Sequence, residues 1–196
     1  MARPRAFDRD EALLRAMGVF WAKGYAATST EDLIQAMQIG RQSLYGAFGD
    51  KRTLYVEALS HYQQVSVQGH LARLRSGDTP LAGVEALLVG LIPEDDVQRA
   101  LGCMGVGAVA EFGAGDAVLA DLRARSGATL FQALVARLRD AQACDELDPG
   151  LDPEQGAEFL QLTMQGLQLG ARAGADRDRL VRLARFSLDR LKATPA

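Results

Sequence analysis

The first 50 residues alternate segments that have one apolar face with short polar breaks, and this pattern predicts three short helices. In the first segment, apolar residues recur at the three- and four-residue spacing of a helix face: Leu13, Met17, Phe20 and Trp21. Asp8 stands where an N-cap is needed, and Gly24 stands where the helix would stop. The first helix is therefore expected between these two residues.

The second and third predicted helices are joined by a turn of three residues, QIG. The second helix, in TSTEDLIQAM, begins at Ser29 and Asp32, which have the spacing of a capping box with Asp in place of the usual Glu. The third, RQSLYGAF, places Leu44 and Phe48 on one face and polar side chains on the other. Together they form a helix-turn-helix pattern.

The third helix is too short to be stable alone, and the way it must pack indicates which face is free to bind a partner. Helices under about 12 residues are marginal in water, so its apolar face must pack against the first two helices while its polar face stays free. An α-helix fits the DNA major groove, where Arg41 could pair with guanine and Gln42 with adenine. Ser43 and Tyr45 suit phosphate or thymine-methyl contacts. The alternative is a solvated face on a small helical domain.

The remainder of the chain predicts an all-α fold with longer helices. Asp50 is a candidate cap for a fourth helix, from Lys51 to about Leu74. Turn residues and apolar periodicity predict further helices at 80–92, 96–111, 116–143, 153–174 and 176–192. We therefore expect a helix-turn-helix DNA-binding domain at 1–50 and a larger helical domain at 51–196, which the fourth helix connects.

Composition agrees with helices and limits the class of protein. The chain has 28 Leu and 32 Ala against 3 Ile and 12 Val, and unbranched side chains lose little rotamer freedom in a helix. No apolar run approaches the roughly 18 residues of a membrane span. No export signal is recognised at the N-terminus either. We expect a cytoplasmic protein without a membrane partner, in which Cys103 and Cys144 are reduced.

Charge is distributed unevenly along the chain. The net charge is -3, yet residues 1–60 hold 8 Lys and Arg against 7 Asp and Glu. Arg3, Arg5 and Arg9 crowd the first nine positions, and a basic arm of this kind could reach DNA phosphates. The alternative interpretation is an ordinary solvated terminus.

The stretch GYAATSTEDLIQAMQIGRQSLYGAFGDKRTLY, with the aromatic residues before KGY, resembles the DNA-binding domain of the TetR/AcrR family of bacterial transcriptional regulators. The resemblance covers about residues 8–56. It implies that the first three helices bind operator DNA and that the rest forms a helical ligand-binding and dimerisation domain. It also implies that a bound ligand releases the DNA.

Individual DNA contacts follow from the same resemblance. It implies phosphate contacts for Thr28, Ser29, Tyr45 and Lys51, and base-reading positions for Arg41 and Gln42. The rest of the expected DNA surface consists of Arg3, Thr30, Gly40 and Ser43. Two residues depart from the family pattern. Gln38 stands where the turn usually has Gly, and Gly40 stands where the third helix usually has a Ser or Thr cap.

The stretch GCMGVGAVAEF resembles a segment of one subgroup of these regulators, in which GCL is followed by an Asn and a Glu. Here Gly107 replaces the Asn and Glu111 is retained. The same stretch fits the dinucleotide fingerprint G-x-G-x-x-A, but no strand pattern precedes it, as that fingerprint requires. We therefore expect no cofactor.

Two stripes of residues, one of glycines and one of leucines, predict how a dimer would form. Gly166, Gly170 and Gly174 are spaced four apart, and three glycines in a helix need compensation from close packing. The preceding helix carries a matching stripe: Leu130, Leu134 and Leu138. Because the resembled family dimerises through a four-helix bundle, we expect a homodimer with both stripes in or near its interface. The alternative is that the stripes face only the core of their own subunit.

An effector cavity would be lined by apolar and aromatic side chains with a few polar ones. The candidates are Tyr62, Cys103, Met104, Phe112, Phe131, Phe159 and Met164, each of which could equally be a core residue. Cys103 has a second possible role as a redox or electrophile sensor, if a helix N-terminus makes its thiol reactive.

Enzyme motifs are absent from the sequence. It contains no G-x-S-x-G, P-loop or H-E-x-x-H, and His61 and His70 have no cluster of metal ligands around them. We therefore expect no enzyme and no metal site. The prediction is a dimeric regulator, a repressor that binds double-stranded operator DNA and is released by a small-molecule effector. The alternatives are a sensor that acts through Cys103 and a helical adaptor that binds proteins.

Overall fold

The computed structural model describes residues 7–192, and this part of the chain is almost entirely α-helical. Within it, one isolated antiparallel bridge pairs Leu147 with Lys192. The helices, in chain order, are α1 Arg9–Lys23, α2 Thr30–Met37, α3 Arg41–Phe48, α4 Lys51–Ser76, α5 Pro80–Val89, α6 Asp96–Leu101, α7 Met104–Phe112, α8 Ala117–Ala143, α9 Pro153–Arg172 and α10 Arg177–Asp189. The predicted all-α fold is confirmed.

The N-terminal helices begin and end where their caps predicted. The Asp8 carboxylate accepts hydrogen bonds from the second and third backbone N–H groups of α1, and the helix ends at Gly24, whose φ is 80°. Ser29 and Asp32 make both halves of the capping box of α2. At the start of α4, the Asp50 carboxylate accepts a hydrogen bond from the Thr53 backbone N–H. These side chains satisfy donors that a helix leaves unpaired in its first turn.

Both departures from the family pattern lie in the turn between α2 and α3. Gln38 adopts the left-handed conformation, with φ 56° and ψ 40°, which residues other than Gly rarely take. Gly40 is the N-cap of α3 and gives it no side-chain hydrogen bond. The turn therefore keeps its geometry, but at a cost in backbone strain and without a side-chain cap.

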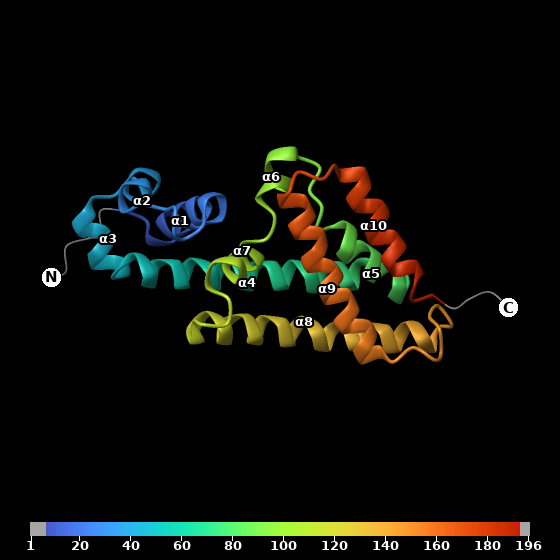
Figure 1. The fold of residues 1–196 in the computed structure, drawn as a ribbon. Helices are drawn as coiled ribbons and strands as arrows, with labels where there is room; N and C mark the ends of the chain where they lie inside the picture. Colours follow the sequence, from blue (N-terminus) through green and yellow to red (C-terminus); the bar gives the residue numbers. More distant parts are fainter. Residues whose placement is uncertain (1–6, 193–196) are drawn as a thin grey trace.

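Two hydrophobic cores hold the molecule together. The N-terminal core is built on α1, α2 and α3 but extends beyond them, because Tyr55 and Leu59 of α4 and Met104 of α7 are buried in it. The C-terminal core is formed by the second half of α4 with α5, α8, α9 and α10. The long helix α4 contributes to both cores and passes from one to the other (Figure 1).

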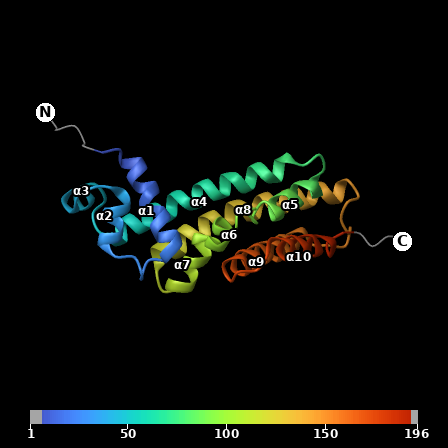
Figure 2. The same ribbon diagram turned by 90° about the horizontal axis from the view of Figure 1, so that it is seen from above.

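The helices α1–α3 form one end of the molecule, and α4 runs from them alongside α8 (Figure 1). Viewed from above, α9 and α10 lie next to each other along one side of the C-terminal half (Figure 2). In the described residues, no helix is both long and apolar enough to cross a membrane.

The expected helix at 96–111 is wrong, because the structure divides it into α6 and α7. Gly102 has φ 60° and ends α6, and Cys103 then serves as the N-cap of α7. The break is fixed from outside, since the Trp21 indole Nε1 donates to the Gly102 carbonyl at 3.1 Å. Three other helices end earlier than expected: α5 at Val89, α9 at Arg172 and α10 at Asp189.

Candidate DNA-binding surface and effector cavity

The helix α3 is held by its apolar face and leaves its polar face open. Leu44 is fully buried and Phe48 is 2% exposed, whereas Arg41, Gln42 and Tyr45 are exposed. The division of α3 into a packed and a free face was predicted from residue spacing and is confirmed. Ser43 lies between the two faces and is half-buried. The Cβ that Gly40 lacks would meet no atom within 4 Å, so this end of α3 is open.

A network around Arg9 fixes α3 relative to α1 and α4. The Arg9 guanidinium makes two hydrogen bonds to the Glu57 carboxylate, at 2.6 and 2.8 Å. It also donates to the carbonyl of Ala47 in the last turn of α3, and it lies 4.4 Å over the Phe48 ring. A bidentate pair of this kind adds geometric restraint as well as energy. Arg9 therefore positions the reading helix instead of reaching for DNA.

The start of α2 presents Ser29 and Thr30 but not Thr28. Ser29 is exposed and Thr30 is half-buried, at the N-terminus of the helix. The Thr28 side chain is 1% exposed, and its hydroxyl donates to the Gly24 carbonyl at 2.6 Å. The phosphate contact expected of the Thr28 side chain is therefore wrong for this conformation, because the hydroxyl already closes the turn after α1.

The capping box of α2 contains a carboxyl group, that of Asp32, whose pKa is lowered. Hydrogen bonding from the Lys23 ammonium, together with hydrogen bonds from Ser29, lowers the pKa of Asp32 to about 2. Asp32 therefore stays ionised at neutral pH, and it can accept from the Ser29 backbone N–H at 2.9 Å. The helix start is thus preformed before any phosphate arrives.

Two of the expected DNA-contacting cations are already engaged within the protein. Arg41 pairs with Glu31 of α2, and both side chains are mostly exposed. An exposed ion pair contributes about 0–1 kcal/mol, so Arg41 can exchange it for a base edge at little cost. The Lys51 Nζ lies 4.3 Å over the Tyr25 ring, which holds the ammonium at the start of α4. The predicted contact of Arg3 lies outside the described residues.

A cavity of about 210 Å³ lies between α4, α7, α8 and α9. Three of the seven predicted effector residues line it, namely Tyr62, Cys103 and Met164. The remaining lining was not predicted and mixes polar with apolar residues: Gln63, Ser66, Val67, His70, Leu91, Gly105, Val106, Arg123, Ser126, Gly127, Leu130, Gln161, Gln165 and Gln168. Polar residues on a helix read as solvent-facing in a sequence, so no local signal marked these glutamines and serines.

The other four predicted effector residues lie elsewhere. Met104 is 3% exposed in the N-terminal core, and Phe112 stacks in an aromatic group, 5.3 Å from Tyr25 between ring centroids. Phe131 packs against the C-terminal core. Phe159 is 40% exposed on the surface. None of these four residues lines this cavity, because apolar character alone does not separate cavity walls from cores and surface.

Several polar groups of the cavity are already paired with one another. The Ser126 hydroxyl donates to Gln63 Oε1 at 3.0 Å, and Gln168 Nε2 donates to the Leu91 carbonyl at 3.1 Å. Burial, with a contribution from Cys103, raises the pKa of Tyr62, so its hydroxyl stays protonated. Burial also lowers the pKa of His70 to about 4, with Arg73 adding to the effect.

His70 is neutral at physiological pH and has spare hydrogen-bonding capacity. Its Nδ1 is buried and has no hydrogen-bond partner among the described residues. A buried polar atom without a partner costs free energy, so a ligand that bonds to it would recover that cost. The cavity is therefore suited to a molecule that brings its own donors and acceptors. No group of three or more metal-binding side chains occurs in residues 7–192.

The leucine stripe predicted for the dimer interface is wrong. Leu134 and Leu138 are fully buried in the C-terminal core of their own chain, and Leu130 is 8% exposed and lines the cavity. The interpretation that this stripe faces the subunit's own core is the one the structure bears out. Gly174 also leaves its predicted place, because it follows the end of α9 with φ 84°.

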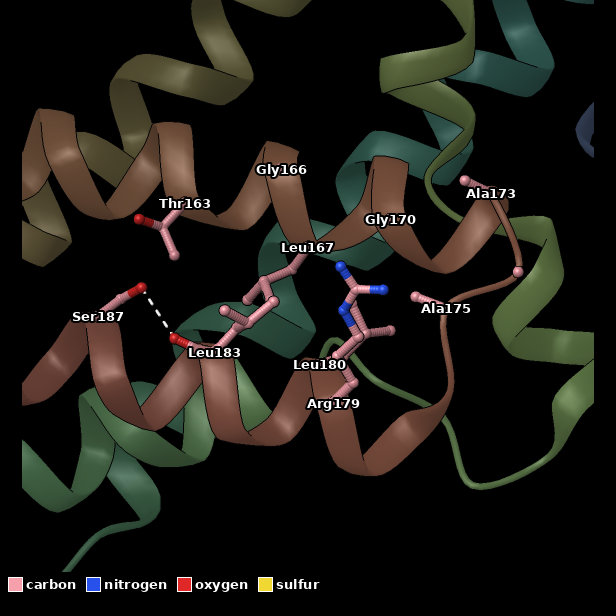
Figure 3. A pocket seen from close by; sticks show the side chains of 11 residues that line it. Thr163, Gly166, Leu167, Gly170, Ala173, Ala175, Arg179, Leu180, Leu183 and Ser187 are labelled. Atoms are coloured by element: carbon pink, nitrogen blue, oxygen red, sulfur yellow. Dashed lines mark hydrogen bonds between the residues drawn. The ribbon is translucent and has the colours of Figure 1, made fainter.

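The glycines Gly166 and Gly170 line an open groove between α9 and α10 (Figure 3). A Cβ at Gly170 would lie 3.2 Å from the Leu180 side chain, so this glycine lets the two helices approach within one chain. Gly166 has open space beside it. From α10, the Leu183 side chain points towards α9 (Figure 3).

The two helices share an unusually apolar exposed surface, which we call the α9–α10 face. It consists of large apolar side chains that are 40–67% exposed: Phe159, Leu162, Leu169, Leu183 and Phe186. Several large exposed apolar side chains on two neighbouring helices mark an interaction surface more often than isolated exposed residues do. The α9–α10 face was not predicted from the sequence, because the predicted interface was based on the glycine and leucine stripes.

Comparisons with known proteins agree with the geometry. Residues 12–58 match the model of the bacterial regulatory proteins, tetR family, and residues 90–187 match that of the tetracyclin repressor-like C-terminal domain. The chain is 31% identical over 190 residues to the HTH-type transcriptional repressor ComR of Escherichia coli K12, covering 95% of this chain and 90% of ComR.

Further relatives and solved structures extend the likeness. The regulator YezE of Bacillus subtilis is 31% identical over 182 residues, covering 92% of this chain and 94% of YezE. A solved structure of the TetR family regulator CifR, in complex with 26-bp operator DNA, has a TM-score of 0.80 at 33% identity and covers 95% of this chain and 98% of its own. Reduced NemR of E. coli, at 18% identity and TM-score 0.81 with 96% and 98% covered, shares the fold.

The helices α2 and α3 and most of α1 lie within the N-terminal match, and α7, α8 and α9 lie within the C-terminal match. The matching relative is a transcriptional repressor and not an enzyme. The chain belongs to the TetR family of bacterial transcriptional regulators.

Proposed function

We propose that this regulator is a homodimeric repressor, which binds a pseudo-palindromic operator through α3 and releases it when a small molecule enters the cavity. The observation that carries the proposal is the free polar face of α3, held in place by Leu44 and Phe48. It is supported by CifR, whose structure is described as a complex with operator DNA, and by ComR, which is named a repressor. Because the regulator would act on operator DNA, its proposed location is the cytoplasm.

Each residue of the proposed DNA surface has a proposed role. Arg41 and Gln42 read bases in the major groove, because their planar donors match guanine and adenine edges. The remaining residues contact phosphates or lie against the backbone: Arg3, Ser29, Thr30, Gly40, Ser43, Tyr45 and Lys51. Phosphate contacts set register and give binding its salt dependence, whereas base contacts give sequence preference.

The α9–α10 face is the proposed dimer interface. Its exposed apolar side chains would be removed from water by a second copy, and α9 and α10 of two chains would form a bundle of four helices. Gly166, which has open space beside it, would allow a partner helix to approach. Two reading helices about 34 Å apart can then enter successive major grooves.

The cavity indicates the chemical class of the effector. Its volume of about 210 Å³ is below the roughly 300–1,000 Å³ of typical ligand pockets, so the molecule is small. Glutamines, serines and neutral His70 supply hydrogen-bonding groups, and Arg123 is the one charged side chain in the lining. We expect a small molecule that combines apolar surface with hydrogen-bonding groups and is not a cation.

A second candidate is covalent sensing at Cys103. Its side chain lines the cavity at the N-cap of α7, and it is half-buried, whereas Cys144 is exposed. Treatment with a mild oxidant would release DNA from the wild type but not from Cys103→Ser if this mode operates. Equal release from both proteins would exclude it.

Fluorescence anisotropy tests the function directly. The purified protein would be titrated onto the intergenic DNA upstream of its own gene and onto a scrambled duplex, at two salt concentrations. We expect a clear preference for the intergenic DNA and weaker binding at higher salt, because condensed counterions are released. Binding that ignores both sequence and salt would contradict the proposal and favour a protein-binding adaptor.

A further inference from the structure

The short helix α7 connects the cavity to the DNA-binding end of the molecule. At its N-terminus, Cys103, Gly105 and Val106 line the cavity. At its other end, Glu111 belongs to the last turn and faces the segment between α1 and α2. A helix of nine residues is about 14 Å long, so one rigid element spans the distance between the two sites.

Glu111 binds this segment through its backbone. Its carboxylate accepts hydrogen bonds from the N–H groups of Tyr25 at 3.0 Å and of Ala26 at 2.9 Å. Gly24 makes room for the carboxylate, because a Cβ at that position would overlap Glu111 Oε1 and its φ of 80° also favours glycine. Two consecutive amides bound by one ionised group make a directional attachment, which we call the Glu111 clamp.

The clamp leads on to an expected DNA contact. The Tyr25 ring, whose backbone N–H the clamp holds, lies under the Lys51 ammonium at 4.3 Å. The same ring packs 5.3 Å from that of Phe112, the residue that follows Glu111 in α7. The path from Cys103 along α7 to Lys51 therefore consists of direct contacts at each step.

We infer that α7 is the element through which cavity occupancy reaches the DNA-binding surface, and that Glu111 is its positioning residue. A molecule in the cavity displaces the start of α7, the Glu111 clamp opens, and Tyr25 and Lys51 lose their fixed place. The inference rests on the proposed function, since it assumes that the cavity controls DNA binding. A ligand acts in this way only if it binds the two arrangements with different affinity.

The competing route runs along α4. Tyr62, Gln63 and His70 of this helix also line the cavity, and Lys51 begins it. If α4 alone moves, the amides of Tyr25 and Ala26 stay protected whether or not the cavity is filled. Hydrogen exchange in the segment 24–28 therefore separates the two routes, and a purely structural role of Glu111 would not make exchange there depend on the cavity.

Two cavity fillers serve as probes while the natural ligand is unidentified. The first is Gly105→Leu, since a Cβ at Gly105 would lie 3.5 Å from Cys103 Sγ and 3.8 Å from Gln63 Nε2, at ordinary contact distance. The second is N-ethylmaleimide on Cys103 in a Cys144→Ser background, with the extent of reaction read by mass spectrometry. The second filler keeps the test valid if the first variant fails to fold.

Each filler is combined with Glu111→Gln, which removes the charge but keeps the shape of the side chain. The matched control is Asp121→Asn, which removes an exposed charge on α8 whose partner is Arg125. The readouts are operator affinity and hydrogen exchange in residues 24–28.

In the wild type and in Asp121→Asn, we expect filling the cavity to weaken operator binding at least about fivefold and to speed exchange in 24–28. In Glu111→Gln, exchange is already fast, and filling the cavity changes affinity less than twofold. Equal weakening in wild type and Glu111→Gln, with unchanged exchange, would overturn the inference in favour of α4. Failure of the unfilled protein to prefer its operator would instead refute the proposed function, and the exchange measurement would still decide the inference.

Discussion

The DNA-reading end of the molecule and its cavity end are built on different principles. The reading end consists of short helices, of which α1 and α2 have side-chain caps, and the residue spacing of α3 leaves its polar face exposed. The cavity is lined by four helices that come from distant parts of the chain, and both polar and apolar side chains face it. Reading DNA needs a rigid local surface, whereas sensing a ligand needs a space that tertiary packing creates.

The largest expected effect tests how far the reading end depends on its core. Leu44→Ala removes a fully buried side chain beneath the reading face and should lower the free energy of unfolding by about 2–5 kcal/mol. Thermal or chemical denaturation measures this loss. Leu14→Ala, the same change at a side chain that is 46% exposed, should cost far less. Similar losses in both variants would contradict the assigned core.

The cavity end should show a pH dependence that the reading end does not cause. Burial lowers the pKa of His70 to about 4, so between that value and its unfolded value of about 6.5 the unfolded chain binds one proton more. Stability from neutral His70 is therefore complete above about pH 6.5 and is lost as the pH falls towards 4, by about 3 kcal/mol at most.

Urea denaturation at several pH values would measure this slope. The variant His70→Asn should flatten the curve in this window, because the buried imidazole is gone. His61→Asn, which replaces the other histidine of α4, serves as the control and should keep the slope. An unchanged curve for His70→Asn would show that His70 does not titrate as its burial indicates.

The proposed dimer would link the two ends, because it would place two reading helices on one operator. Phe186→Glu puts a charge on the α9–α10 face, where the phenylalanine is 57% exposed. We expect monomers in sedimentation and loss of cooperative operator binding. Val97→Glu makes the same change at a valine that is 74% exposed on α6 and should leave the dimer intact. An intact dimer for Phe186→Glu would remove the proposed interface.

Within the reading end, base-reading and phosphate-binding residues should separate. Arg41→Ala should reduce the discrimination between operator variants by about 1–3 kcal/mol, because a bidentate base contact is lost. Lys51→Ala should weaken binding to all sequences alike and lower the salt dependence by about one counterion. Anisotropy on a set of operator variants measures both. Unchanged preference in Arg41→Ala would remove its assignment as a base reader.

The smallest effect concerns the turn between α2 and α3. Gln38 holds a left-handed conformation that glycine adopts without strain, so Gln38→Gly should stabilise the protein by about 1 kcal/mol. Chemical denaturation measures the gain. Gln35→Gly, inside α2, should instead destabilise by a similar amount, since glycine weakens a helix interior. Destabilisation by Gln38→Gly would indicate that the Gln38 side chain contributes contacts of its own.

The sequence predicted the helix starts and packed faces of the reading end, but it did not predict most of the cavity lining. The start of α2 followed from Ser29 and Asp32, and the two faces of α3 followed from Leu44 and Phe48, because these signals act within one or two helical turns. Thr28 was the exception, since its hydroxyl is used inside the turn. The cavity residues Gln63 and Gln168 carried no local mark of their burial.

The sequence by itself determined the helical class, the caps, the reading face and the family resemblance. Each of these depends on residues close together in the chain. Only the tertiary structure decided that Leu134 and Leu138 face their own core, and that Glu111 binds the backbone of Tyr25, 86 positions away. Periodicity shows that a residue has an inward side, but the packing of distant helices decides whether it meets a core, a cavity or another part of the fold.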